Sequence, residues 1–149
     1  MKAKILFLFI ATSIFVACNQ GSQKTNNEQV KNEITQNPNL KLQIYYFHAT
    51  HRCPTCNSIE ANIKQVLESN FKNEIEQGII NFTVLNVEDA ENKNLAEKFQ
   101  ATGAALHLVD IENGTEKDND LTKYAFSYSR KQPDVFLKGM NDTINYFIK

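Results

Sequence analysis

The chain has 149 residues, a formal net charge of −1 and 22% charged residues, with three cysteines and no tryptophan. This near-neutral balance, without a basic stripe, argues against a nucleic acid as partner. The five glycines are too sparse for a phosphate-cradling loop, and nothing in the sequence implies an organic cofactor.

The first 17 residues have the features of an export signal. Residues 1–4 carry positive charge, residues 5–16 are apolar but too short to span a bilayer comfortably, and Ala17 precedes Cys18. This pattern resembles a bacterial lipoprotein signal, in which the cysteine after the cleavage point is lipidated. We therefore expect lipidation of Cys18 and an extracytoplasmic, membrane-anchored protein in the periplasm or cell envelope.

Two further observations bear on this expectation. Phe15 stands where leucine is usual in such signals, and the alternative is an ordinary cleaved signal in which Cys18 is incidental. In favour of lipidation, modification of Cys18 removes the odd cysteine from an oxidising compartment and leaves one pair, Cys53 and Cys56.

Residues 18–39 are dominated by Asn, Gln, Lys and Glu and are nearly devoid of large apolar side chains. Such a segment cannot bury enough surface to order itself, so we expect a flexible tether. A polar helix or arm around residues 30–34 is the alternative. Residues 40–149 then have the length of one small domain with one core.

The domain begins with a predicted buried strand at residues 42–48, where β-branched and aromatic side chains are frequent. A helix is expected from Pro54, which suits a first helical turn, to Gly78 as C-cap, with or without a break before Ile75. Its apolar residues have the spacing of one helical face: Ile59, Ile63, Val66, Leu67 and Phe71.

The rest of the domain continues this alternation. Asn113-Gly114 favours a type I′ hairpin turn, the polar residues around Asp118 are expected to form a solvated loop, and residues 121–130 are ambiguous. Further strands are predicted at 79–87, 104–111 and 115–117, and further helices at 92–100 and from Pro133, the last with Phe136, Leu137, Met140, Ile144 and Phe147 on its buried side. The predicted order is β-α-β-α-β-β-α, which belongs to the α/β class.

The segment "HRCPTC" places Cys53 and Cys56 where the first strand gives way to the first helix. Together with "FQATGAALHLVDIENG" at residues 99–114, it resembles the thioredoxin-like superfamily. The resemblance implies a single thioredoxin-like domain around a central mixed sheet. It also implies a thiol-disulfide oxidoreductase in which Cys53 is the nucleophile and Cys56 resolves mixed disulfides with protein substrates and with a membrane or periplasmic redox partner.

The placement of Cys53 at a helix N-terminus suits this chemistry. Free backbone N–H groups and the positive end of the helix dipole favour a thiolate there, and neighbouring Arg52 and protonated His51 would add positive potential. We therefore expect a lowered pKa for the Cys53 thiol.

The sequence departs from the thioredoxin pattern at three places. Arg52 replaces the tryptophan before the first cysteine, and the first strand carries no buried acid. Ala105, after Ala104, stands where the family has a cis-proline that faces the disulfide. We expect a trans peptide bond before Ala105 and weaker general disulfide reductase activity.

Two other functions remain open at this point. His48, His51, Cys53 and Cys56 could bind copper or zinc, because all four are donors that these metals accept. The disulfide could instead be purely structural in a non-enzymatic domain. His107 is expected to be an ordinary strand residue, and the aromatic residues Tyr124, Phe126 and Tyr128 are expected to cover the core.

Overall fold

The computed structural model describes residues 37–149. They form a four-stranded sheet with the order β2-β1-β3-β4. The central strand β1 (Leu42–His48) pairs in parallel with β2 (Ile80–Asn86) and antiparallel with β3 (Ala105–Glu112). β4 (Thr115–Asp120) adds antiparallel to β3. This mixed sheet confirms the predicted thioredoxin-like fold.

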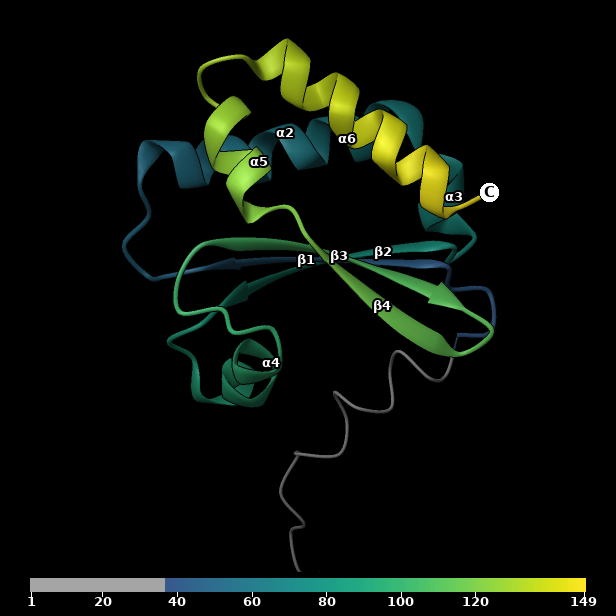
Figure 1. Ribbon diagram of the computed structural model, residues 1–149, viewed down its shortest axis with the longest axis horizontal. Helices are drawn as coiled ribbons and strands as arrows, with labels where there is room; N and C mark the ends of the chain where they lie inside the picture. The colour runs from purple at the N-terminus through teal and green to yellow at the C-terminus, as the bar shows by residue number, and fades with distance from the viewer. Residues whose placement is uncertain (1–36) are drawn as a thin grey trace, which may run out of the picture.

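Helices cover the two faces of the sheet unequally (Figure 1). The long helices α2 (Pro54–Asn70) and α6 (Pro133–Phe147) lie on one face with α5 (Thr122–Tyr128), and the short α3 (Lys72–Glu76) follows α2. On the other face, the described residues contribute the short α4 (Lys93–Lys98), which follows the 3-10 turn η1 (Ala90–Asn92).

The alternation of side chains along β1 supplies both cores. Tyr46 belongs to the larger core under α2 and α6, whereas Tyr45 and Phe47 belong to the smaller core under α4. Tyr46 and Phe47 are both fully buried. Consecutive large side chains are therefore needed in β1, because a strand covered on both faces has no solvent-facing positions.

The predicted apolar face of the first helix is confirmed. Ile59, Ile63, Val66 and Leu67 are all buried in the larger core. α2 is also tied to the end of α5, because Asn62 Nδ2 donates a hydrogen bond to the carbonyl of Ser129 at 2.7 Å. The helix is interrupted at Phe71, and α3 follows directly. Gly78, with a φ of 71°, then ends the helical backbone before β2.

The prediction of a solvated loop around Asp118 is wrong. β4 continues to Asp120, with Asp118 opposite Val109 and Asp120 opposite His107 in the register with β3. The strand lies at the edge of the sheet, and five of its six residues are exposed, so its sequence lacks the apolar alternation of a half-buried strand. α5 occupies most of the segment that was ambiguous in sequence.

The described part of the chain starts a little before the predicted domain boundary. Asn37 Nδ2 donates to the carbonyl of Gly78 at 2.9 Å, so residues 37–39 adjoin the domain. The predicted signal at 1–17, Cys18 and the tether up to residue 36 lie outside the described residues. Within residues 37–149, no helix has both the length and the apolar character required to cross a bilayer.

Gly139 allows α5 to pack closely on α6. Tyr124 Oη donates to the carbonyl of Val135 at 2.8 Å, and its ring stacks on Phe136 with centroids 5.6 Å apart. A Cβ at position 139 would collide with the Tyr124 hydroxyl and lie 2.9 Å from Cζ. The close approach therefore requires glycine in the middle of α6.

We predict that Gly139→Ala lowers the free energy of unfolding by about 1–2 kcal/mol, because overpacking outweighs the better helix propensity of alanine. Denaturant titration of both proteins measures this difference. In a Tyr124→Phe background, which lacks the hydroxyl, the same substitution should cost less. A stabilised Gly139→Ala protein with an intact Tyr124 would contradict the packing described here.

Candidate active site

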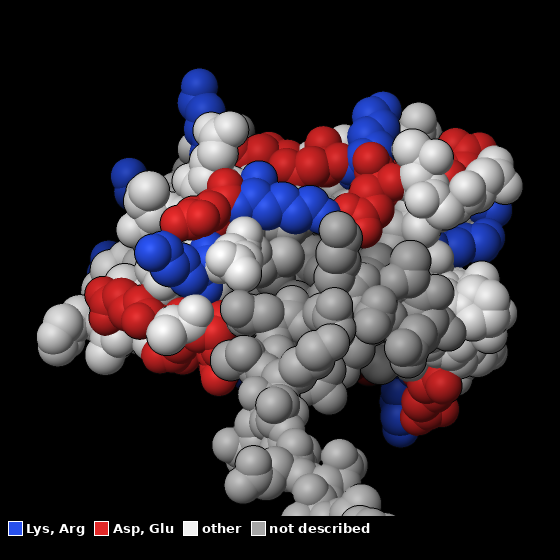
Figure 2. All heavy atoms as spheres, turned by 90° about the horizontal axis from the view of Figure 1, so that it is seen from below, with Lys and Arg blue, Asp and Glu red and all other residues white. Residues whose placement is uncertain are grey.

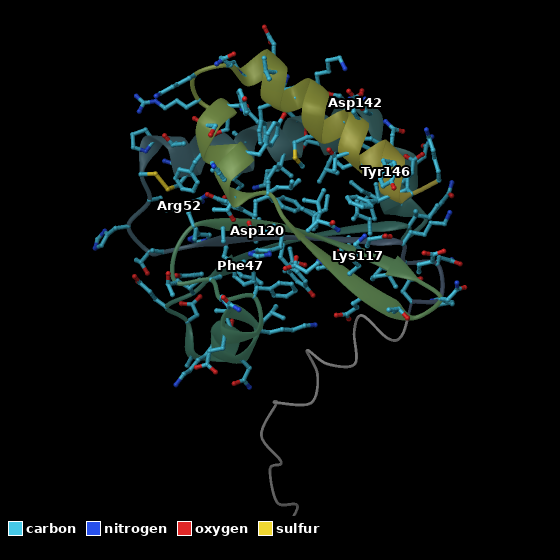
Figure 3. The ribbon with its side chains drawn as sticks, in the orientation of Figure 1. Phe47, Arg52, Lys117, Asp120, Asp142 and Tyr146 are labelled. Atoms are coloured by element: carbon cyan, nitrogen blue, oxygen red, sulfur yellow. A yellow bond between two sulfur atoms is a disulfide. The ribbon has the colours of Figure 1, made fainter. Side chains whose placement is uncertain are left out.

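The disulfide lies at one end of the sheet, where the chain leaves β1 and enters α2 (Figure 3). Cys53 is the N-cap of α2 in extended conformation, and Pro54 occupies the first helical turn. Proline has no N–H to leave unpaired there, and its fixed φ suits the start of a helix. The sequence thus sets Cys53 outside the helix and Cys56 inside its first turn.

Cys53 and Cys56 form a disulfide with a Cα–Cα separation of 5.1 Å. Cys53 is exposed, whereas Cys56 is only 8% exposed, as the sequence predicts. The Sγ of Cys53 accepts a hydrogen bond from the backbone N–H of Cys56 at 3.0 Å. One of the free N–H groups of the helix therefore points at this sulfur, where it would stabilise a thiolate in the reduced protein.

Two side chains hold the carbonyl group of Cys56. Tyr46 Oη donates to it at 2.7 Å from the central strand, and Arg52 Nη2 donates at 3.4 Å. The Arg52 guanidinium also lies 5.6 Å from the centre of the Tyr46 ring. Burial raises the pKa of Tyr46, which keeps its hydroxyl protonated as a donor. The first turn of α2 is thereby fastened to β1.

Arg52 is paired with Glu60, one turn beyond Cys56 on α2. Arg52 Nη1 lies 2.5 Å from Glu60 Oε2, and Lys64 Nζ lies 2.5 Å from Glu60 Oε1. Burial works against the charge of Glu60, but the hydrogen bonds from Lys64 and Arg52 outweigh it and hold its pKa below the ordinary value. Burial likewise works against the charge of Arg52, and its bonds to Glu60 and Tyr46 leave its pKa raised.

This ion pair changes the expected role of Arg52. The sequence predicts that its charge stabilises the Cys53 thiolate, and the structure places a compensating carboxylate against the same guanidinium. Sequence reasoning missed both Glu60 and Tyr46. The available signal was the four-residue spacing from Cys56 to Glu60, which puts them on one face of α2.

Ala105 begins β3 directly opposite Phe47, the residue before the last position of β1. No peptide bond within residues 37–149 is cis, so the bond between Ala104 and Ala105 is trans, as predicted. The assignment of Ala105 to the cis-proline position of the family remains a prediction.

The four residues of the metal alternative do not form a cluster in the disulfide-bonded protein. Across residues 37–149, no three His, Cys, Asp or Glu side chains converge on a point where a metal ion could sit. His48 Nδ1 is 3.0 Å from the carbonyl oxygen of Ala49, and its ring lies beside Tyr46. His107 lies in the smaller core on the other face of the sheet, 5.9 Å from the ring of Phe47.

Charge on the described surface is mixed. Figure 2 shows basic and acidic side chains interspersed over the described part of the face that carries α4. Lys93 and Glu97 form an i,i+4 pair along α4, and Lys98 pairs with Glu116 of β4. The described side chains visible in this view form no single-sign patch of the kind that binds a nucleic acid.

No family model matches the chain, and no curated protein matches its sequence. The solved structures that are similar to it include three thioredoxins. They are the Trichomonas vaginalis thioredoxin (24% identity, 63% of this chain and 75% of that chain, TM-score 0.45), the Fasciola hepatica thioredoxin (18%, 74% and 92%, 0.43) and the oxidized mitochondrial thioredoxin 3 of Saccharomyces cerevisiae (17%, 76% and 87%, 0.45). The thioredoxin-like fold of this chain is therefore assigned from its own sheet order and the position of its disulfide.

Proposed function

We propose that this protein is an extracytoplasmic, membrane-anchored thiol-disulfide oxidoreductase that acts on protein substrates through Cys53 and Cys56. The observation that carries the proposal is the environment of Cys53. Cys53 is an exposed residue at a helix N-terminus, and its sulfur accepts a backbone N–H and is bonded to a buried partner three residues later. A purely structural disulfide needs neither the exposed cysteine nor the N–H directed at its sulfur.

The reaction uses the two sulfurs in sequence. In the reduced protein, the Cys53 thiolate attacks one sulfur of a substrate disulfide, the substrate S–S bond breaks, and the first substrate sulfur leaves as a thiolate. Cys56 then loses its proton to solvent and attacks the sulfur of Cys53, which breaks the mixed disulfide and releases the second substrate thiolate. The substrate has gained two electrons, and Cys53–Cys56 is the disulfide seen here.

A dithiol partner reduces the Cys53–Cys56 disulfide by the same steps in reverse. When the protein acts as an oxidant, a dithiol of the substrate takes the place of that partner. Tyr46 and Arg52 act as positioning residues in both directions. They hold the Cys56 carbonyl, so the first turn of α2 keeps its place while bonds form and break at the sulfurs.

One prediction from the proposed function concerns the two thiols. In reduced protein near neutral pH, iodoacetamide should label Cys53 before Cys56, because Cys53 is exposed and stabilised as a thiolate. Peptide mass spectrometry after timed quenching identifies the labelled cysteine. Cys56→Ser should accumulate mixed disulfides with substrate proteins, whereas Cys53→Ser should not. Faster labelling of Cys56 would reverse the assigned roles.

A second prediction concerns the charge of Glu60. Glu60→Gln removes the anion that balances Arg52, so the guanidinium charge acts more strongly on the nearby sulfur. We expect the pKa of the Cys53 thiol to fall by about 0.5–1, which corresponds to about 0.7–1.4 kcal/mol, and the protein to become more oxidising because its reduced form is stabilised. Thiolate absorbance during a pH titration and equilibrium with glutathione measure the two effects.

Matched variants separate charge from structure. Glu68→Gln removes an exposed carboxylate two turns further along the same helix and should leave both quantities unchanged. Arg52→Gln should raise the pKa of Cys53. If Glu60→Gln and Glu68→Gln behave alike, the Arg52–Glu60 pair has no part in setting the acidity of the thiol.

A third prediction tests the anchor. The charged start, short apolar run and Ala17–Cys18 junction lead us to propose that the mature chain begins at an acylated Cys18. Mass spectrometry of protein extracted from membranes should find acyl mass on an N-terminal Cys18, and Cys18→Ser should release the protein from the membrane fraction. A soluble cytosolic protein with Met1 intact would refute this location.

A further inference from the structure

The two edges of the sheet differ in their chemistry. β2 and β4 are the outermost strands in the order β2-β1-β3-β4, so each has one side without a strand partner among residues 37–149. An unpaired edge can pair with a strand of another chain, and proteins discourage this with charged side chains, proline or short edge strands. The two edge strands follow this rule to different degrees.

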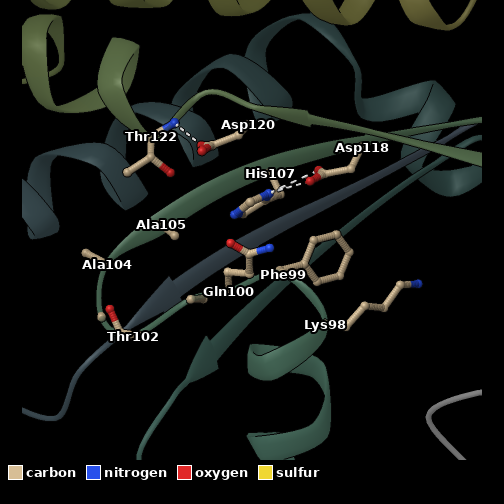
Figure 4. Close-up of a pocket in the computed structure, with 12 residues that line it drawn as sticks. Lys98, Phe99, Gln100, Thr102, Ala104, Ala105, His107, Asp118, Asp120 and Thr122 are labelled. Carbon is tan, nitrogen blue, oxygen red and sulfur yellow. Dashed lines mark hydrogen bonds and ion pairs between the residues drawn. The ribbon is translucent and has the colours of Figure 1, made fainter.

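β4 carries the protection that an edge strand needs. Four of its six residues are charged: Glu116, Lys117, Asp118 and Asp120. It also borders a cavity of about 480 Å³ on the face of the sheet opposite to α2, where Nδ1 of His107 lies 3.0 Å from the Asp118 carboxylate (Figure 4). These charges oppose the addition of another strand to β4.

β2 lacks this protection. Its seven residues, Ile80–Asn86, include no charged residue and no proline. Besides the buried Ile80, the strand contains three large apolar side chains, and all three are half-buried: Phe82, Val84 and Leu85. A long, apolar and uncharged edge strand of this kind is a site for strand pairing.

The register of β2 shows which of its backbone groups are open. The Val87 N–H donates to the carbonyl of His48 at 2.8 Å, so residue 87 directs its backbone at β1. Every second residue before it does the same, because the pairing of β1 with β2 is continuous. The N–H and C=O groups of Phe82 and Val84 point the other way, and none of the residues 37–149 bonds to them.

We propose that two copies of this chain associate through β2 as an antiparallel dimer, with Thr83 opposite the partner's Thr83. In this register Phe82 lies opposite the partner's Val84, and Val84 lies opposite the partner's Phe82. The open backbone groups of each such pair exchange both N–H···O=C hydrogen bonds across the two-fold axis. Pairs of an aromatic with a β-branched residue, and of two threonines, are favourable across strands.

Charge and symmetry favour a second copy as the occupant of this edge. β2 is uncharged, so two copies meet without opposing like charges, and a two-fold pair closes on itself. Pairing of β2 with β4 of another copy would instead place charged side chains opposite Phe82 and Val84, and it would continue head to tail without closing.

An exposed apolar side chain lies next to the same edge. Ile75 on α3 is 39% exposed. α3 is bonded to the start of β2, because the Ile79 N–H donates to the carbonyl of Glu74 at 2.8 Å. An antiparallel partner strand runs toward this end of β2, so the second copy can cover Ile75.

Substitutions at the two-fold axis test the pairing. Thr83 and the partner's Thr83 form a non-hydrogen-bonded pair, in which side chains come closest. Thr83→Lys and Thr83→Glu each oppose like charges and should weaken the dimer about tenfold. An equimolar mixture of the two variants should restore it, because opposite charges then meet. Thr83→Gln keeps an oxygen for the Gln43 Nε2 donor, which lies 3.0 Å from Thr83 Oγ1, and should remain dimeric.

Sedimentation equilibrium of the full chain in a density-matched detergent measures the mass of the protein alone. Cys53–Cys56 is kept oxidised, and non-reducing electrophoresis excludes a disulfide through Cys18. Val84→Pro serves as a second variant: it removes an outward N–H without removing a bond between β1 and β2, so it should fold and be monomeric. In the unmodified protein, amide exchange of Phe82 and Val84 should slow as the protein concentration rises.

A monomer at every concentration would overturn the proposal. Concentration-independent protection of the Phe82 and Val84 amides in that monomer would assign the edge to the chain before Asn37, which is bonded to Gly78 just before β2. Fast exchange would leave the edge open. A dimer that is equally stable in Thr83→Lys, Thr83→Glu and their mixture would place the interface elsewhere. None of these measurements depends on the thiol chemistry.

Discussion

The burial of β1 on both faces is the constraint on which the rest of the structure depends. This strand pairs with β2 and β3 and lies between two helical layers, so every side chain of its centre has a packing partner. A strand held this firmly provides a fixed frame for the turn that follows it. Tyr46 connects that frame to the turn, because its ring is buried in the core and its hydroxyl donates a hydrogen bond to the carbonyl of Cys56.

The Arg52–Glu60 pair connects this frame to the chemistry of the sulfurs. An isolated arginine beside a nucleophilic cysteine would act only as a positive charge, whereas one held by Glu60 and by the Cys56 carbonyl also fixes the geometry of the turn. Lys64 adds a second cation on the other oxygen of Glu60. The chain thus lacks the buried acid of the thioredoxin strand but carries a partly buried acid on the helix, near the second cysteine.

The sequence was sufficient to predict the features with strong local patterns. Consecutive large residues marked β1, the helical spacing from Ile59 to Phe71 marked α2, and the cysteine spacing with Pro54 marked the site. β4 could not be predicted to its full length, because an edge strand of charged and polar residues has no apolar alternation. Glu60 and the His107–Asp118 pair escaped notice for another reason: their partners come together only through the helix face and the β3–β4 register.

The unequal covering of the sheet explains why this chain has two distinct chemical environments. Long helices cover the larger core on one face and present the N-terminus of α2, where a thiolate would be stabilised in the reduced protein. On the other face, α4 has only six residues and covers the smaller core near Phe99, so the end of β3 and β4 beyond it stays open. Acidic residues of an exposed edge strand can therefore line a cavity beside a buried histidine, whereas the same residues under α2 or α6 would be unpaired charges in an apolar core.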